Sequence, residues 1–176
     1  MSTTKPLDGI KVIEISTIIT ASLSAMMLSD QGAEVIKIEQ TGFGDPLRYL
    51  GTQKGGISAI FANTNRGKKS IELDLKTESD LEQAKKLISE ADVLINNFRP
   101  GVMDSLGLGK EDCKTLNKNL IYVAITGFGK EGPYANAPAY DHVVQAMSGS
   151  TAIQADEDKP KYIKTLLCDK ITAYTA

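Results

Sequence analysis

The sequence has very little of what metal centres and disulfide frameworks require. Its 176 residues include one histidine, two cysteines and no tryptophan. Cys113, Cys168 and the lone His142 show no spacing typical of metal ligands, so we expect no bound metal. Two distant cysteines are also too few for a disulfide framework, and they favour a reducing cytoplasm as the location.

Long apolar runs and an excess of charge of one sign are missing as well. The longest stretch without a charged residue, 15–29, is shorter than a membrane span and rich in serine and threonine. The first residues contain no apolar segment typical of a secretory signal. The formal net charge of −2 gives no reason to expect nucleic acid or an anionic membrane as partner. The sequence therefore indicates a soluble protein, long enough for one domain with a substantial core.

Short β-branched runs alternate along the chain with segments of helical periodicity. We predict strands over 10–15, 35–39, 70–75, 93–96 and 120–126, and helices over 21–31, 57–63, 77–89, 110–116 and 140–147. This order favours parallel strands joined by right-handed crossovers, and so an α/β fold with a mostly parallel sheet and flanking helices. Ligands of such sheets bind beyond the carboxyl ends of the strands. The segments expected there are 16–22, 39–45, Lys76, 97–101 and 127–140.

Two stretches match known phosphate loops only in part. Residues 127–132 fit G-x-G-x-x-G after a predicted strand, but Pro133 and Pro138 prevent the helix that a dinucleotide motif requires. Residues 67–70 resemble the end of a P-loop, yet Ala62 stands where its first glycine is needed. We therefore expect neither a nicotinamide cofactor nor a P-loop.

Basic residues gather near the predicted strand ends. They are Lys37, Arg66, Lys68, Lys69, Lys76 and Arg99. Such a group suits a polyanionic ligand with phosphates at separate points. A solvated surface of mixed charge is the alternative, because Glu39, Glu72 and Asp74 lie close by in the sequence.

Asp169 follows an apolar run and precedes a predicted helix. A carboxylate there has its ionised form favoured by the free N–H groups of the helix, so Asp169 is interpreted either as an N-cap or as a catalytic carboxylate. His142 lies beside Asp141 on another predicted helix. This pair is interpreted as structural or surface-exposed, with proton transfer as the alternative.

Several stretches together resemble one family. They are PLDGIKV (6–12), GAEVIKIE (32–39) with Gly44-Asp45 and Arg48, NRGKKSI (65–71) running into LDLK (73–76), ADVLINNFRPG (91–101) with Leu106-Gly107, ITGFG (125–129) with Gly132-Pro133, and Tyr140-Asp141 with Gln145-Ala146 and Ser148-Gly149. In order and spacing they are similar to the class III CoA-transferases (CaiB/BaiF family), which include the 2-methylacyl-CoA racemases. The resemblance extends from about Pro6 to the end of the chain.

The resemblance implies a Rossmann-like large domain that binds acyl-CoA, and an interlocked homodimer. Asp169 falls at the position of the transferase nucleophile, which attacks the thioester and passes through an acyl-aspartyl anhydride and an aspartyl-CoA thioester to the acceptor carboxylic acid. The implied CoA contacts, with Lys37 added from the basic group, are Thr20, Lys37, Gln40, Leu73, Lys76, Asn97, Phe98, Arg99, Tyr140 and Asp141.

The chain departs from the family pattern in several places. Thr20-Ala21-Ser22 stands where Ala-Gly-Pro is usual, Ala173 replaces a glycine after the nucleophile, and Ser105 replaces an arginine that some members use on CoA. Racemases of the family have Gly-His-Asp where this chain has Ala139-Tyr140-Asp141, so Tyr140 favours a transferase over the alternative racemase. His142 is displaced by two residues and is expected to point elsewhere.

Members of the family are about twice this length. We therefore expect the chain, residues 1–176, to be the N-terminal portion of the large domain, without the small domain and the segment that returns from it. On this interpretation the 176 residues alone are inactive, while the full-length protein is a transferase. A non-catalytic CoA-binding fragment is the third alternative.

Overall fold

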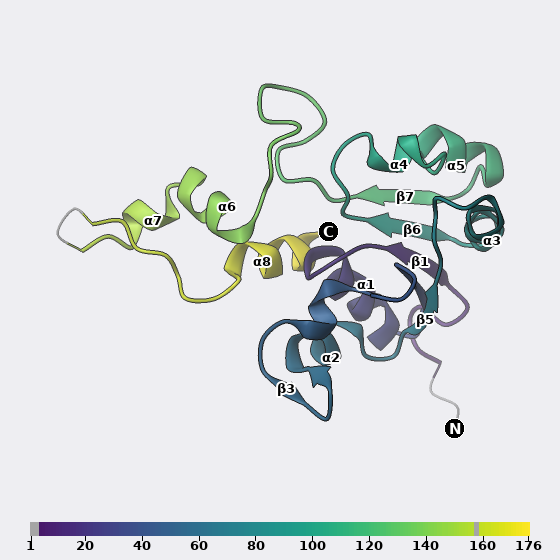
Figure 1. The fold of residues 1–176 in the computed structure, drawn as a ribbon, viewed down its shortest axis with the longest axis horizontal. Helices are drawn as coiled ribbons and strands as arrows, with labels where there is room; N and C mark the ends of the chain where they lie inside the picture. The colour runs from purple at the N-terminus through teal and green to yellow at the C-terminus, as the bar shows by residue number, and fades with distance from the viewer. Residues whose placement is uncertain (1–3, 157–158) are drawn as a thin grey trace.

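A five-stranded parallel sheet forms the centre of the computed structural model, which describes residues 4–156 and 159–176 (Figure 1). The strands are β1 (Lys11–Ile15), β2 (Glu34–Glu39), β5 (Lys69–Glu72), β6 (Val93–Asn96) and β7 (Ile121–Ala124). Their order is β5-β2-β1-β6-β7, and every neighbouring pair is parallel. The predicted α/β class with a mostly parallel sheet is confirmed.

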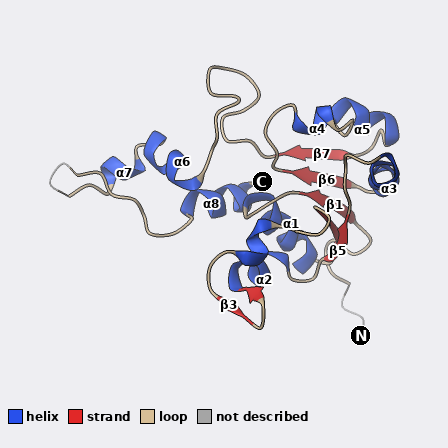
Figure 2. Cartoon of the chain, in the orientation of Figure 1, coloured by secondary structure: helices blue, strands red, loops and turns tan. Residues whose placement is uncertain are grey.

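Helices cover both faces of this sheet (Figure 2). The α-helices of the described chain are α1 (Thr20–Asp30), α2 (Ala59–Asn65), α3 (Glu78–Ser89), α4 (Val102–Ser105), α5 (Lys110–Leu116), α6 (Asp141–Met147), α7 (Ser150–Ile153) and α8 (Leu167–Thr175). A 3₁₀ helix, η1 (Pro46–Tyr49), and a small hairpin of β3 (Gln53–Lys54) and β4 (Ile57–Ser58) lie between β2 and α2.

The alternation of side chains along β1 explains the two layers. Ile13 and Ile15 pack with Ile88 of α3 and Cys113 of α5 on one face. Val12 packs with alanines of α1 on the other face. Strands covered on both faces are expected to be apolar throughout, so the buried Glu14 in β1 is an exception that needs polar partners.

After β7 the chain leaves the sheet and then returns. Figure 1 shows α6 and α7 standing away from the sheet, with α8 between them and α1. The Ser24 hydroxyl of α1 donates to the Ala173 carbonyl of α8 (2.7 Å). Ala173 also packs with Ile19, Leu23 and Leu47 in a third apolar cluster. These contacts bring the last helix onto the carboxyl side of β1.

The predicted elements all occur, with shifted ends. The strand predicted over 70–75 ends at Glu72, the one over 120–126 spans Ile121–Ala124, and the helix predicted over 57–63 is Ala59–Asn65. Thr77, the N-cap residue of α3, makes no side-chain capping bond. In the described residues no helix is both long enough and apolar enough to span a membrane.

Candidate active site

A cavity of about 650 Å³ opens at the carboxyl ends of β1, β6 and β7. The turn after β1 lines one part of it, and residues of α6 and α8 line another. The polar and charged side chains that line it are Thr17, Thr20, Asn97, Arg99, Thr126, Tyr140, Asp141, His142, Asp169 and Thr172. This is the edge at which a parallel α/β sheet is expected to bind its ligand.

The turn after β1 is held from two sides. The Thr17 N–H donates to Asn97 Oδ1 (3.1 Å), and Asn97 Nδ2 donates to the Thr17 carbonyl (2.8 Å) and to Thr20 Oγ1 (3.0 Å). The Ile18 N–H donates to Asp45 Oδ1 (3.0 Å). Ile18 has φ 66°, in the left-handed region. A conformation of that kind costs about 1–3 kcal/mol for a non-glycine residue, so these bonds hold a strained turn.

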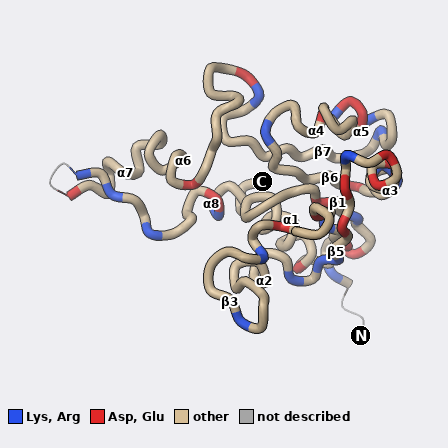
Figure 3. Tube along the Cα trace, viewed as in Figure 1, with Lys and Arg blue, Asp and Glu red and all other residues tan. Residues whose placement is uncertain are grey.

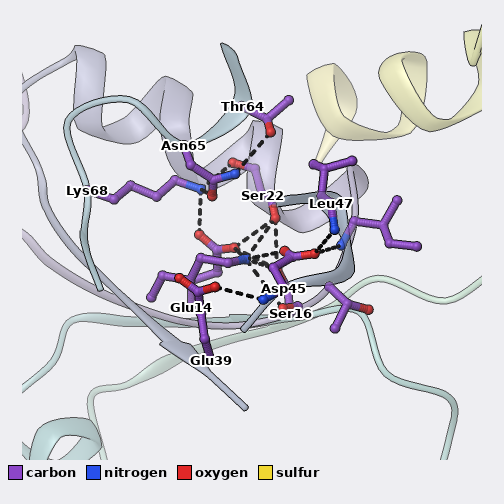
Figure 4. Close-up of polar contacts among 12 residues, drawn as sticks. Glu14, Ser16, Ser22, Glu39, Asp45, Leu47, Thr64, Asn65 and Lys68 are labelled. Carbon is purple, nitrogen blue, oxygen red and sulfur yellow. Dashed lines mark hydrogen bonds and ion pairs between the residues drawn. The ribbon is translucent and has the colours of Figure 1, made fainter. Parts of the chain in front are cut away.

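A buried network of charges lies behind this turn (Figure 4). Glu14 accepts from Lys37 Nζ (2.6 Å) and Lys68 Nζ (2.7 Å), and Lys37 Nζ also lies 2.9 Å from Asp45 Oδ2. Burial alone would raise the pKa of Glu14, but the two ammonium groups outweigh it and lower that pKa to about 2. Burial likewise lowers the pKa of Lys68 to about 8, with Glu14 opposing the shift.

The basic residues are therefore mostly paired within the protein. Besides Lys37 and Lys68, Arg66 pairs with Asp30, and Lys69 pairs with Glu34. Figure 3 shows acidic and basic residues intermixed around the sheet. The Lys37 side chain is buried and bound to two carboxylates, so the interpretation of Lys37 as a CoA contact is wrong for this arrangement. Of the group, Lys76 and Arg99 have no ion pair among residues 4–156 and 159–176.

Asp169 lies in the first turn of α8 and lines the same cavity as the strained turn. The interpretation of Asp169 as an N-cap is wrong, because the helix begins at Leu167 with Leu166 at the N-cap position. Leu166 packs against the third apolar cluster, and this packing sets where the helix begins. Asp169 instead projects its carboxylate into the cavity that it lines.

The neighbour of Asp169 is a second carboxylate. Asp141 Oδ2 accepts the Asp169 N–H (3.1 Å), and Asp141 Oδ1 accepts from Gln145 Nε2 (2.5 Å). Gln145 in turn binds the Ile163 N–H (2.9 Å), which ties α6 to the segment before α8. Burial raises the pKa of the Asp169 carboxyl, and the charge of Asp141 raises it further. The helix start therefore does not give Asp169 the lowered pKa expected from an N-cap.

His142 also belongs to this cavity. It lines the cavity, and its charge lowers the pKa of Asp169, against the two larger effects. Its ring packs edge-on against Tyr162 with centroids 5.3 Å apart. The expectation that His142 points elsewhere is therefore wrong, because Tyr140, the N-cap of α6, and His142, in its first turn, both line this cavity.

The cavity gathers most of the predicted site residues. Those that line it are Thr20, Asn97, Phe98, Arg99, Tyr140, Asp141 and Asp169. Gln40 and Leu73 lie outside it, directly after β2 and β5, and Lys76 is exposed three residues further on. The Leu73 side chain is buried in the core, so only its backbone is left for a ligand.

Sequence reasoning missed Ile18 and Asp45 as parts of the site. Asp45 had a detectable signal, because an aspartate directly before a proline is typical of an N-cap, and its carboxylate does accept the Leu47 N–H. Ile18 had none, because a β-branched residue gives no indication of a left-handed backbone. In the described part of the chain, no group of three or more His, Cys, Asp or Glu side chains could hold a metal ion.

Comparison with known proteins identifies the family. The sequence profile of CoA-transferase family III matches residues 7–176. The chain is a member of this family. It is 44% identical over 155 residues to an acetyl-CoA:oxalate CoA-transferase of Acetobacter aceti, covering 88% of this chain and 40% of that protein. A succinate–glutarate CoA-transferase of Agrobacterium fabrum is 41% identical over 160 residues, with 87% and 40% coverage.

A solved structure agrees with this family III assignment. The crystal structure of a CaiB/BaiF family protein from Brucella suis superimposes with a TM-score of 0.90 at 38% identity, covering 98% of this chain and 48% of that one. This family III chain thus spans less than half the length of the relatives it matches.

Proposed function

We propose that the full-length protein carrying this chain is an acyl-CoA:carboxylate CoA-transferase with Asp169 as its nucleophile. The observation that carries the proposal is the placement of Asp169. In a family III chain, it is a half-buried carboxylate that lines the large cavity at the carboxyl ends of the strands. The two curated relatives named above are both CoA-transferases that act between carboxylic acids.

The reaction balances as four acyl transfers. Asp169 Oδ attacks the thioester carbonyl, the C–S bond breaks, and CoA leaves as thiolate. The thiolate attacks the Asp169 carboxyl carbon of the resulting anhydride and releases the first carboxylate. The acceptor carboxylate then attacks the carbonyl carbon of the aspartyl-CoA thioester and displaces the thiolate, which gives a second anhydride. The thiolate attacks the acceptor's acyl carbon in this anhydride, forms the new acyl-CoA and frees Asp169. This series of reaction steps needs neither a metal nor nicotinamide, because the carboxylate is the nucleophile and nothing is oxidised.

The surroundings of Asp169 suit this role. A nucleophilic carboxylate must be ionised, and partial burial beside Asp141 makes the charged form less stable and so more reactive than in water. CoA is proposed to extend from this cavity past Phe98 and Arg99. Its far end would reach the carboxyl ends of β2 and β5, where Gln40, the Leu73 backbone and Lys76 lie.

The test is Asp169→Asn in the full-length protein. We expect acyl exchange to fall by at least about 10³-fold, as for the loss of other covalent nucleophiles. Hydroxylamine should trap the wild-type acyl-aspartate as a hydroxamate on the peptide that contains Asp169. The matched control is Asp112→Asn, because Asp112 also lies in the first turn of a helix but is distant from the cavity. Near-normal exchange by Asp169→Asn would show that another group is the nucleophile.

A racemase is the second candidate, and His142 is the observation that favours it. His142 and Asp169 line the same cavity and are two groups able to move a proton. A 2-methylacyl-CoA in deuterated water distinguishes the two functions. We expect no exchange of its α-proton, and rapid exchange that depends on His142 would favour the racemase instead.

The family also supports proposals about the whole protein. We propose that it is a cytoplasmic, interlocked homodimer and that the 176 residues do not catalyse exchange by themselves. The exposed apolar side chains of Met147, Ile153 and Tyr162 around α6 and α7 support a surface covered by further chain or a partner subunit. Measurable exchange by the purified 176 residues would refute the proposal that they are inactive alone.

A further inference from the structure

The turn between β1 and α1 has a backbone conformation that its sequence does not favour. Among residues 4–156 and 159–176, Ile18 is the one non-glycine residue with positive φ (66°). Branching at Cβ makes this region especially unfavourable for isoleucine. The conformation of the turn must therefore be imposed by groups outside it.

Two side chains from distant segments impose it. Asp45 accepts the N–H of Ile18 (3.0 Å), and Asn97 holds the N–H and carbonyl of the preceding Thr17 (3.1 and 2.8 Å). The peptide plane between Thr17 and Ile18 is thus fixed at both of its polar atoms. The residues that follow, Ile19 and Thr20, line the same cavity as Asp169.

Asp45 is itself fixed by the buried network (Figure 4). Its Oδ2 lies 2.9 Å from Lys37 Nζ, and its own N–H donates to Glu39 Oε2 (2.8 Å). Lys37 in turn lies against Glu14, with both side chains buried. These contacts anchor Asp45 to β1, the central strand of the sheet, and to its neighbour β2, so its carboxylate can impose a conformation on the turn.

We propose that Asp45 is a positioning residue of the active site. Its carboxylate holds Ile18 in the left-handed conformation and thereby sets the shape of the part of the cavity that the turn lines together with Asp169. The inference rests on the proposed transferase function. Capping of η1 through the Leu47 N–H (2.9 Å) is a local role and requires neither the bond to Ile18 nor the ion pair with Lys37.

Kinetics of Asp45→Asn in the full-length protein test the proposal. Asparagine keeps one acceptor oxygen but loses the ion pair that orients it. We expect kcat to fall about 10- to 100-fold, as for a displaced reacting group, while the KM for acyl-CoA changes less and the protein still unfolds cooperatively. The control is Asp92→Asn, whose carboxylate accepts the Lys11 N–H (2.8 Å) at the other end of β1. The control should keep the wild-type kcat.

A double-mutant cycle with Ile18→Gly tests whether Asp45 acts through Ile18. Glycine adopts positive φ without strain, so a glycine at position 18 does not need the Asp45 carboxylate to keep it in that conformation. We expect Ile18→Gly to lower kcat by a smaller factor in the Asp45→Asn background than in the wild type. Factors that multiply independently would show that Asp45 does not act through Ile18 and would overturn the proposal.

Hydrogen exchange gives a readout that does not depend on the reaction. The peptide that contains residues 16–23 should exchange faster in Asp45→Asn and unchanged in Asp92→Asn. Wild-type kcat with unchanged exchange in Asp45→Asn would overturn the proposal, as would faster exchange throughout the protein. If the wild type transfers no acyl group, the proposed function fails, whereas faster exchange confined to 16–23 would still support Asp45 as the residue that holds the turn.

Discussion

Two carboxylate clusters flank the turn at 17–20, and their electrostatics are opposite. Glu14 is completely buried, yet its pKa is lowered to about 2 because Lys37 and Lys68 outweigh the effect of burial. Asp169 is only partly buried, yet its pKa is raised, first by burial and then by the neighbouring Asp141. For Glu14 the neighbouring cations decide the direction of the shift against burial, whereas for Asp169 burial and the charge of Asp141 act in the same direction.

The difference separates a structural role from a chemical one. A carboxylate paired with two ammonium groups is stable as an anion and suits the support of a backbone turn. A carboxylate beside another carboxylate costs folding free energy at neutral pH, and such groups are typical of reactive sites. The turn at 17–20 therefore lies beside two clusters. The cluster around Glu14 holds the turn, and the cluster around Asp169 lines the cavity that the turn helps to shape.

The largest expected effect comes from removing a cation of the structural cluster. Lys37→Met leaves Asp45 buried without its ion pair, and the loss of one partner of a buried pair costs about 3–5 kcal/mol. Chemical denaturation of the full-length protein measures this change. The control Lys69→Met removes a surface pair with Glu34 and should cost far less, because solvent screens an exposed pair. Equal losses in the two variants would contradict the view that the buried network is structural.

Lowering the pH should reduce the contribution of the structural cluster around Glu14 to stability and should relieve the unfavourable contribution of Asp169 in the cavity. The pKa of Glu14 and that of Glu39 are both lowered from 4.5 to about 2, Glu39 by hydrogen bonds from Arg48 and Ser70 that outweigh burial. Their contribution to stability is therefore present above about pH 4.5 and is lost as the pH falls toward 2. The raised pKa of Asp169 changes stability in the opposite direction as the pH falls, since protonation removes the repulsion between the Asp169 carboxylate and Asp141.

Denaturation curves over this pH range measure both effects. Glu39→Gln should flatten the acid-side loss of unfolding free energy, because it removes one of the two groups. Asp169→Asn should leave that loss unchanged or steeper and should not destabilise the protein at neutral pH. A flatter curve for Asp169→Asn would show that its carboxylate is stabilised by folding, and the contrast between the clusters would be wrong.

The smallest expected effect is a shift in the pH dependence of acyl exchange. Because Asp169 must be ionised to attack, kcat/KM should fall on the acid side as its carboxyl is protonated. Asp141→Asn removes a charge that raises the Asp169 pKa, so the acid limb should move to lower pH. His142→Ala removes a charge that lowers this pKa and should move the limb the other way. Shifts in the same direction would contradict the assignment.

The sequence predicted the layers of the fold well because periodic apolar patterns report which faces are buried. The strands at 11–15 and 34–39 and the helix between them lie within a residue or two of their predicted ends. Seven of the eleven predicted site residues line one cavity, since strand ends in a parallel sheet meet at one edge.

What the sequence could not predict depends on contacts between distant segments. Lys37 was interpreted as a ligand contact because it belongs to the basic group near the strand ends. Nothing in the sequence around it indicates that Glu14 and Asp45 pair with it. The N-cap of α8 was misplaced because the packing of Leu166, not the polarity of Asp169, sets the helix start. The left-handed backbone of Ile18 follows from bonds to Asp45 and Asn97 and has no local signal.

The sequence separation of these contacts has a consequence for how the protein is made. The bond from Lys68 to Glu14 spans 54 residues, whereas the bond from Ser24 to Ala173, which anchors α8, spans 149. At ribosomal rates of about 5–20 residues per second, α8 emerges roughly 5–20 s after Lys68. The network behind the turn can thus close while the proposed nucleophile is still untranslated, and Asp169 would then dock onto a turn that is already formed.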